Sequence, residues 1–298
     1  MAGATYYPAV HYGAVFPQAE FDRVDPEEIV AFVQRLEDAG YDHLIVYDHI
    51  LGADTANRPG WNGPYDLDDP FLEPMVLFSY LARACRLEFV TSVMVLPQRQ
   101  TALVAKQVAT LSCLAPGRLR LGVGIGWNDV EYAALGMDFA GRAARLEEQV
   151  TLLRRLWSEP SVNHDGQPER VEAAGLAPLP PGPVPIWMGT GAHPRALNRV
   201  GRLADGWMPM PAVQPDRGLE AAWGEVGRVA AAEGRDPDAI GLEGQIWVPP
   251  DRLGTARERA DHWAESGAAA VAINSLRCGA RWPDGHLDLL LRAAEAIL

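Results

Sequence analysis

Positive charge is scarce in this chain. Its 298 residues include 26 arginines and lysines against 39 aspartates and glutamates, which leaves a formal net charge of −13. Proteins that bind nucleic acid or anionic membranes without reading a sequence need basic patches, so the composition argues against both partners. No apolar run approaches the roughly 20 residues that cross a bilayer. The N-terminal segment also lacks the basic region and the long apolar core of a signal peptide.

Cysteine is rare as well, and it is not clustered. Cys85, Cys113 and Cys278 form an odd, scattered set without a Cys-x-x-Cys pair, which is typical of reduced, structural thiols in a cytoplasmic protein. No spacing of histidine, cysteine and aspartate suits a metal ion, and no nucleophile, base and acid of the hydrolase type stand out. Hydrophobic residues make up 48% of the chain, enough to bury a full core.

Short apolar runs alternate with amphipathic segments from end to end, which predicts parallel strands joined by right-handed helical crossovers. Eight such repeats without a linker-rich boundary predict a single (β/α)8 TIM barrel over residues 1–298. An open doubly wound sheet is the alternative, but it usually has fewer strands and one dominant glycine fingerprint. The eight predicted strands are residues 10–16, 43–48, 89–96, 118–126, 184–189, 206–210, 240–248 and 269–274.

Two connections are longer than the rest, and we interpret them as insertions after strands two and four. Residues 51–70 are rich in glycine, proline, asparagine and aspartate, yet Trp61, Tyr65 and Leu67 interrupt them. This favours an active-site insertion over disorder. Residues 159–183, which follow the helix after strand four, form a second Pro/Gly-rich excursion.

The reactive groups of such a barrel sit at the carboxyl ends of its strands. Asp48 and His49 end the second strand, and a histidine there can act as acid, base or hydrogen-bond donor. The alternative is an aspartate that caps the loop and a packed histidine. Residues 189–192 end the fifth strand and precede a helix, so their backbone N–H groups suit an anion. The alternative is an ordinary turn that needs glycine.

Three glycines, Gly122, Gly124 and Gly126, lie along the fourth strand. They are not a dinucleotide fingerprint, because no capped helix follows them at once. Glycines in a strand more often let another backbone or a flat ligand approach closely.

Several motifs together resemble the bacterial luciferase-like family. They are Leu-Pro-Gln-Arg at 96–99, Ala-Lys-Gln-Val-Ala-Thr-Leu at 105–111, Pro-Gly-Arg-Leu at 116–119, Leu-Gly-Val-Gly-Ile-Gly-Trp at 121–127, Ala-Leu-Gly at 134–136 with Phe139 and Arg142, the turn at Gly189, and Asp-Gly-Trp at 205–207. The resemblance covers most of the chain and is weakest over 51–70 and beyond Pro211. It implies a TIM barrel, often a homodimer, that uses reduced FMN or the deazaflavin coenzyme F420.

Within that family the chain looks most like the F420-dependent oxidoreductases, whose second strand typically ends in Ser-Asp-His. Tyr47 takes the place of the serine. The resemblance implies that His49, with Asp48 beside it, is catalytic and lies near the deazaflavin ring. It also implies a bulge in the third strand, with a non-prolyl cis peptide at Ser92–Val93 that supports the ring from one face. The cofactor-binding residues expected on this basis are Ser92, Val93, Gly124, Gly126, Trp127, Gly189, Thr190, Gly191 and Ala192.

One departure bears on the substrate. Sugar-phosphate dehydrogenases of this group carry an acid directly after the glycines of strand four, where this chain has Trp127. The basic cluster that such enzymes use for a substrate phosphate is not evident either. We therefore expect an apolar or aromatic pocket rather than one for glucose 6-phosphate, with Trp61, Trp127, Trp207 and Trp247 as candidate walls.

The leading hypothesis is an F420-dependent oxidoreductase that moves hydride between C5 of the deazaflavin and a small organic substrate. By resemblance we expect a homodimer that uses the helices at 71–85 and 100–114. A second hypothesis is a monooxygenase that takes reduced FMN from a separate reductase and consumes O₂. A third is a non-catalytic flavin-binding protein on the same barrel.

Overall fold

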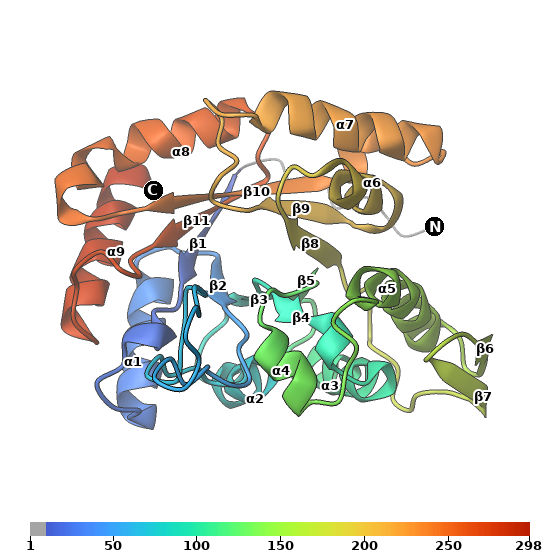
Figure 1. Ribbon diagram of the computed structural model, residues 1–298. Helices are drawn as coiled ribbons and strands as arrows, with labels where there is room; N and C mark the ends of the chain where they lie inside the picture. The colour runs from blue at the N-terminus through green and yellow to red at the C-terminus, as the bar shows by residue number, and fades with distance from the viewer. Residues whose placement is uncertain (1–9) are drawn as a thin grey trace.

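Parallel strands close into a barrel in the computed structural model, which describes residues 10–298 (Figure 1). The barrel strands are β1 (His11–Val15), β2 (His43–Val46), β3 (Glu88–Thr91), β4 (Met94–Val95), β5 (Leu119–Gly124), β8 (Ile186–Thr190), β9 (Gly206–Pro209), β10 (Gly241–Trp247) and β11 (Ala270–Asn274). The segments β3 and β4 are two halves of one barrel strand, and each pairs with β5. Counted in this way the barrel has eight strands, and the predicted (β/α)8 fold is confirmed. Residues 1–9 of the predicted 1–298 domain lie outside the described residues.

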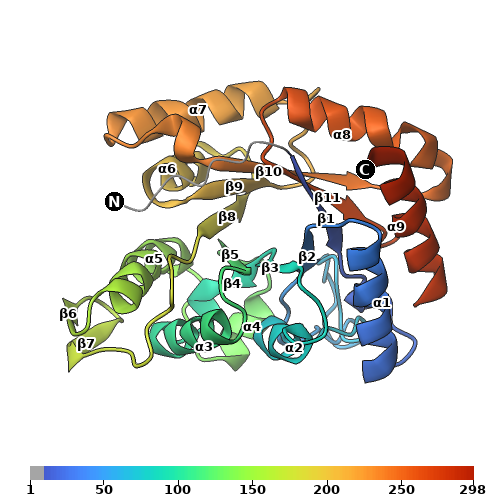
Figure 2. The same ribbon diagram turned by 180° about the vertical axis from the view of Figure 1, so that it is seen from behind.

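Helices surround the barrel, with α7 and α8 on one side and α2 and α3 on the opposite side (Figures 1 and 2). Their bounds are α1 (Pro26–Asp38), α2 (Pro74–Leu81), α3 (Thr101–Leu114), α5 (Arg142–Ser158), α6 (Pro194–Leu203), α7 (Leu219–Ala232), α8 (Ala256–Glu265) and α9 (Asp284–Ile297). Short 3-10 helices add η1 (Gln18–Glu20), η2 (Leu96–Gln98), η3 (Pro237–Ala239) and η4 (Pro250–Thr255). Within residues 10–298, no helix combines the length and the apolar character that a membrane crossing requires.

The helix starts follow from their caps. The Asp25 side chain accepts hydrogen bonds from the backbone N–H groups of Glu27 and Glu28, which fixes the start of α1. The helix expected from residue 71 begins at Pro74 instead. Glu73 is its cap and accepts from the N–H of Val76 at 2.8 Å, and a proline in the first turn is compatible only with a helix start at that point.

Two elements were not predicted. A six-residue helix, α4 (Asp129–Ala134), follows β5 almost at once, and the second insertion folds into an antiparallel hairpin of β6 (Val162–Asp165) and β7 (Arg170–Ala174) beside α5 (Figure 1). The hairpin strands are mostly exposed and polar, so they lack the apolar alternation by which a strand is read from sequence.

The barrel interior is packed by a small apolar cluster that is separate from the large core between strands and helices. Its members include Val15, Ile45, Val90, Trp187, Met208 and Ala272. Below this cluster, towards the amino ends of the strands, the interior is charged. Glu243 of β10 accepts from His43 of β2 at 2.7 Å and from Arg120 of β5 at 2.9 Å, and Arg120 also donates to Glu88 of β3 at 3.0 Å.

This network holds an ionised carboxylate inside the barrel. Burial by itself would raise the pKa of Glu243, but the attraction of Arg120 and His43 outweighs it, and the pKa lies below its ordinary value. Four strands are joined through these side chains. The carboxylate therefore stabilises barrel closure at any pH where it is charged.

Replacing Glu243 with glutamine should destabilise the fold by roughly 3–5 kcal/mol, because Arg120 loses its buried counter-charge. The depressed pKa makes this contribution fully present above about pH 4.5, and the contribution falls as the pH drops through the folded-state pKa. Urea denaturation as a function of pH measures both effects. The matched control is Glu225→Gln, whose partner Arg228 is an exposed neighbour on the same helix; it should change stability by less than about 1 kcal/mol. Equal losses in the two variants would contradict the assignment.

Candidate functional site

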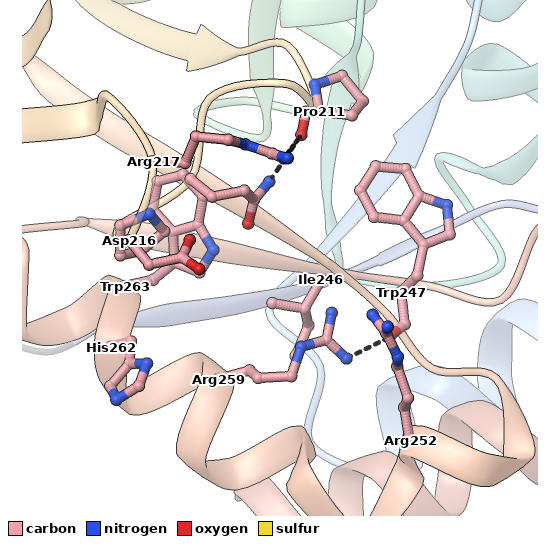
Figure 3. A pocket seen from close by; sticks show the side chains of 11 residues that line it. Pro211, Asp216, Arg217, Ile246, Trp247, Arg252, Arg259, His262 and Trp263 are labelled. Atoms are coloured by element: carbon pink, nitrogen blue, oxygen red, sulfur yellow. Dashed lines mark hydrogen bonds between the residues drawn. The ribbon is translucent and has the colours of Figure 1, made fainter.

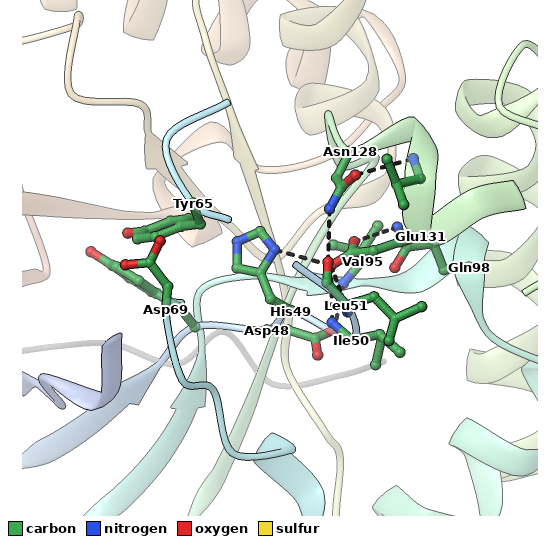
Figure 4. A network of polar contacts seen from close by, with 12 residues as sticks. Asp48, His49, Ile50, Leu51, Tyr65, Asp69, Val95, Gln98, Asn128 and Glu131 are labelled. Carbon is green, nitrogen blue, oxygen red and sulfur yellow. Dashed lines mark hydrogen bonds and ion pairs between the residues drawn. The ribbon is translucent and has the colours of Figure 1, made fainter. Parts of the chain in front are cut away.

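Two features occupy the carboxyl ends of the barrel strands. One is a pocket at the end of β10 (Figure 3), and the other is a network of polar contacts around His49, which follows β2 (Figure 4). The insertion at 51–70 and α4 lie at this end of the barrel, facing the viewer in Figure 1. The geometry around His49 makes this network the candidate catalytic site.

Aromatic rings enclose His49. The centroid of its imidazole lies 4.6 Å from Phe71, 5.0 Å from Tyr65 and 5.5 Å from Trp127. Trp61 stands 5.6 Å from Trp127 and donates from Nε1 to the backbone oxygen of Tyr65. The His49 side chain keeps 12% of its surface exposed. The result is a histidine in a largely apolar setting with limited access for water.

A buried carboxylate fixes the orientation of this histidine. Glu131 of α4, whose side chain is 1% exposed, lies with Oε1 3.1 Å from Nδ1 of His49 (Figure 4). The same oxygen accepts from the N–H of Ile50 at 2.9 Å and from that of Leu51 at 3.4 Å, while Oε2 accepts from Nε2 of Gln98 at 2.8 Å. A carboxylate with this many donors binds them best when it is ionised.

The ionisation state follows from the competition of two effects. Burial would raise the pKa of Glu131, but the hydrogen bonds from His49 and Gln98 outweigh it and hold the pKa below its ordinary value. An ionised carboxylate only accepts, so Nδ1 of His49 carries a proton. Nε2 is then the ring nitrogen left to exchange a proton or a hydrogen bond with a ligand.

Asp48 points elsewhere. Its Oδ2 accepts from the N–H of Val95 at 3.0 Å and its Oδ1 accepts from Arg99 at 2.7 Å, and Arg99 also pairs with Glu73 at 3.1 Å. Alternation along the strand sends Asp48 and His49 to opposite sides. The catalytic part expected for Asp48 stays a prediction, and its contacts are those of a side chain that positions β4.

The residues expected to hold a cofactor ring come together where β3 gives way to β4. The predicted cis peptide at Ser92–Val93 is confirmed. The methyl groups of Val93 occupy the space that a Cβ on Gly124 or Gly189 would need, since each such atom would lie 2.4 Å from Val93. One continuous surface is thus formed by Val93, Gly124 and Gly189 on three neighbouring strands of the barrel. Only Val93 contributes a side chain to it.

The other glycines of strand four have local causes. A Cβ on Gly122 would lie 1.9 Å from the carbonyl oxygen of Thr91, and one on Gly126 would lie 2.5 Å from Val95. Gly126 also has a φ of +65°, which favours glycine. The first of the two explanations left open by the sequence, the close approach of another part of the chain, accounts for Gly122 and Gly126.

The turn at 189–192 offers free donors. The carbonyl oxygen of Thr190 is used by Nε1 of Trp207 and by the N–H of Met210, both at 3.1 Å. Within residues 10–298, no acceptor is found for the backbone N–H groups of Gly191 and Ala192. These groups precede α6 and are available to an anion, and the phosphate site at this turn stays a prediction.

The expected tryptophan walls divide into two groups. Trp127 borders His49 and Trp61 packs on Trp127, whereas Trp247 lines the pocket at the end of β10. The interpretation of Trp207 as a wall was wrong. Its side chain is fully buried and stacks on Trp223, with 6.1 Å between ring centroids, because alternation along β9 points it outward to α7.

Glu131 was not singled out from the sequence, because α4 itself was not predicted. A signal was present. Asn128 caps α4 by accepting from the N–H of Val130 at 3.1 Å, and its Nδ2 donates to the backbone oxygen of Leu51 at 3.1 Å. Asparagine followed by two acids within the next three residues is a typical helix start, and it would have placed Glu131 on a helix that faces the insertion.

Comparison with known proteins gives a consistent result. The sequence profile of the family described as luciferase-like monooxygenase matches residues 7–277. The F420-dependent glucose-6-phosphate dehydrogenase of Mycolicibacterium smegmatis is 30% identical over 265 residues, which are 87% of this chain and 76% of that protein. The enzyme of the same name from Nocardia farcinica is 31% identical over 265 residues, with the same shares.

Solved structures share the fold. An F420-dependent secondary alcohol dehydrogenase in complex with an F420-acetone adduct superposes with a TM-score of 0.75 at 18% identity, over 97% of this chain and 99% of the other. The coenzyme F420 dependent tetrahydromethanopterin reductase from Methanopyrus kandleri gives 0.72 at 15% identity, over 97% and 98%. At these identities the likeness concerns the barrel alone.

Replacing Glu131 with glutamine tests the network around His49. An amide has one acceptor oxygen and a donor NH₂, so it cannot serve the four donors that converge on the carboxylate. We expect a loss of about 2–3 kcal/mol in stability and faster hydrogen exchange at the amides of Ile50 and Leu51. The control is Asp129→Asn, an exposed acid on the same helix. Unchanged exchange at both amides would contradict the role of Glu131.

Proposed function

The chain belongs to the luciferase-like monooxygenase family, and on this premise we propose that it is an F420-dependent oxidoreductase that transfers hydride between the deazaflavin and a small organic substrate. The observation that carries the proposal is its identity of 30–31% to F420-dependent dehydrogenases over 87% of the chain. The site is compatible with this cofactor, because it offers a surface in which only Val93 carries a side chain, free backbone donors and an oriented histidine at one end of the barrel.

The proposed cofactor site assigns a role to each group of residues. Val93, Gly124 and Gly189 support one face of the ring, with Ser92, Gly126 and Trp127 bordering it. The N–H groups of Gly191 and Ala192, with Thr190, bind the phosphate. When bound, the deazaflavin supplies hydride chemistry at C5, and the protein supplies placement and electrostatics.

His49 is the proposed proton donor or acceptor of the reaction. With Nδ1 held by Glu131, Nε2 is free to give a proton to a substrate oxygen or to take one from it as the hydride moves the other way. The carboxylate stabilises the imidazolium that forms in the second case. Tyr65, Phe71 and Trp127 keep water away from this nitrogen, which strengthens the interaction between the charges.

For the substrate we propose an apolar or aromatic molecule rather than glucose 6-phosphate. The support is the ring of aromatic side chains around His49, where relatives that oxidise sugar phosphates are expected to place an acid. Residues 51–70 complete this wall. They are held from the far side by Arg277, which donates to the backbone oxygen of Pro64 and lies 4.9 Å above the ring of Tyr65.

We further propose a homodimer formed through α2 and α3. These helices pack against each other and carry exposed apolar side chains: Val76 is 68% exposed, Tyr80 48% and Leu103 53%. Single exposed apolar residues are common on surfaces, and the presence of three on two helices that pack together is what supports this proposal. The cytoplasmic location remains a prediction from the cysteine content.

Cofactor choice is tested by titrating the protein with F420 and with FMN while following ligand fluorescence. We expect F420 to bind at least about tenfold more tightly, a difference of roughly 1.4 kcal/mol. Equal affinities, together with oxygen consumption in the presence of reduced FMN and a reductase, would favour the two-component monooxygenase instead.

The part of His49 is tested with His49→Ala and a substrate panel of alcohols, aldehydes and enones. Turnover should fall on the order of 10²-fold or more, as for loss of a general acid or base, while F420 affinity stays within about threefold of wild type. The control is His164→Ala on the distant β6–β7 hairpin, which should leave turnover unchanged. Retained turnover in His49→Ala would refute the catalytic assignment, and a wild type that binds F420 but turns over nothing in cells or extracts would favour a binding protein.

The dimer is tested by light scattering of Leu103→Glu and Val76→Glu. Placing a carboxylate in a buried apolar contact costs several kcal/mol, so each variant should shift from dimer to monomer. Val24→Glu, at a residue that is 51% exposed outside α2 and α3, is the control and should stay dimeric. A wild type that is monomeric would overturn the proposal.

A further inference from the structure

A pocket of about 610 Å³ lies at the end of β10, apart from the network around His49 (Figure 3). It is bounded by the loop after β9, by Trp247 at the end of β10, and by η4 and α8. Its lining includes Pro211, Asp216, Arg217, Arg252, Arg259 and His262. Three arginines and one acid therefore share one pocket in a chain with a formal net charge of −13.

Two of these arginines lack a counter-ion within the described residues. The Arg252 side chain has no hydrogen bond or ion pair there, and Arg259 has only the backbone oxygen of Trp247, to which it donates at 2.6 Å. Several other arginines that are at least partly buried have a carboxylate within 3.1 Å, among them Arg99, Arg120, Arg145, Arg154 and Arg199. Arg118 and Arg142 resemble Arg259, because within the described residues they too donate to backbone oxygens and have no carboxylate partner.

The guanidinium groups in the pocket repel one another. Burial and the neighbouring Arg252 guanidinium lower the pKa of Arg259. Arg259 is partly buried and has no acidic partner within the described residues, and Arg252 is exposed beside it. A bound anion would give both guanidinium groups a shared charged acceptor. Arg217 adds a third guanidinium, which is folded over its own loop by hydrogen bonds to the backbone oxygens of Ala212 at 2.9 Å and Pro211 at 3.4 Å.

The lining of the pocket includes apolar as well as charged side chains. Ile246, Trp247 and Trp263 contribute apolar surface to the wall, so the space suits a small organic anion as well as an inorganic one. The pocket also opens at the same end of the barrel as the proposed cofactor site. The loop that bounds it is tied to the turn at 189–192 by the hydrogen bond from the N–H of Met210 to the oxygen of Thr190.

We propose that this pocket binds a carboxylate or phosphate group of a ligand through Arg252 and Arg259, with Arg217 at its rim. It is a basic cluster that the sequence did not reveal, because Arg217 belongs to a different segment from Arg252 and Arg259 and only the fold brings them to one pocket. The anionic group belongs either to the acidic tail of the proposed deazaflavin coenzyme or to a separate small molecule. The second source, if it is the substrate, rests on the proposed function and narrows its substrate class.

Calorimetric titration with inorganic phosphate and with glutarate, at constant ionic strength, tests the pocket without any catalytic assay. Wild type should bind at least one probe, and Arg252→Ala should weaken that binding at least about tenfold, since a charge-assisted contact of this kind is worth about 1.5–3 kcal/mol. Arg259→Lys keeps the charge and the fold while losing the fork of donors, and it should weaken binding less. Asp216→Asn removes the one acid of the lining and should strengthen binding a few-fold. Arg228→Ala, on the exposed face of α7, is the control.

The source of the anion is separated by a second pair of titrations. F420 is compared with the deazaflavin chromophore that lacks both phosphate and tail. If Arg252→Ala weakens F420 but leaves the chromophore unchanged, the pocket binds the coenzyme tail; if it weakens only phosphate or glutarate, the pocket binds a separate anion. Two results would overturn the proposal. In the first, Arg252→Ala and Arg259→Lys bind phosphate, glutarate and F420 as tightly as wild type does. In the second, wild type binds none of the three. Tight binding of the chromophore in that case would still leave the proposed function standing.

Discussion

The Glu131 carboxylate joins three parts of the chain that are distant in sequence. It receives the histidine and two backbone N–H groups at the end of β2, it receives Gln98 from η2, and it is carried by α4 after β5. The position of each depends on the negative charge, because four donors cannot converge on a neutral group without loss. The orientation of His49, the start of the insertion at 51–70 and the packing of α4 therefore depend on one ionised side chain.

A second buried carboxylate, that of Glu243, likewise joins distant parts of the chain at the other end of the barrel. Glu243 is held by Arg120 and His43 among the amino ends of the strands, below an apolar layer centred on Trp187. Arg120 lies 4.5 Å from the face of that indole. The lower network contributes to closure and is sealed, whereas the upper one leaves Nε2 of a histidine open. The same chemistry, a buried carboxylate with cationic or neutral donors, joins strands at the lower end and orients the proposed catalytic histidine at the upper end.

The sequence predicted the barrel well, because its strands are short apolar runs bounded by glycine and proline and because eight repeats leave few alternatives. It located His49 for the same reason, since a strand end is visible in the pattern. It failed where contacts join distant residues. Glu131 lies 82 residues from His49, and the arginines of the pocket come from the loop after β9, from η4 and from α8. It also misplaced Trp207, because the phase of alternation in a strand as short as β9 is not determined by four residues.

The distribution of arginine gives a last argument about selectivity. Most arginines at least partly buried in this acidic chain are paired with carboxylates, so their charges are cancelled locally and contribute little field at a distance. The pocket at the end of β10 differs, because its guanidinium groups outnumber the single acid and face solvent. An anion that approaches this pocket therefore meets a local excess of positive charge in a chain whose formal net charge is −13. Such a field orients a ligand with one charged end and one apolar end, with the charge at Arg252 and Arg259 and the remainder free to extend along the tryptophan-lined wall.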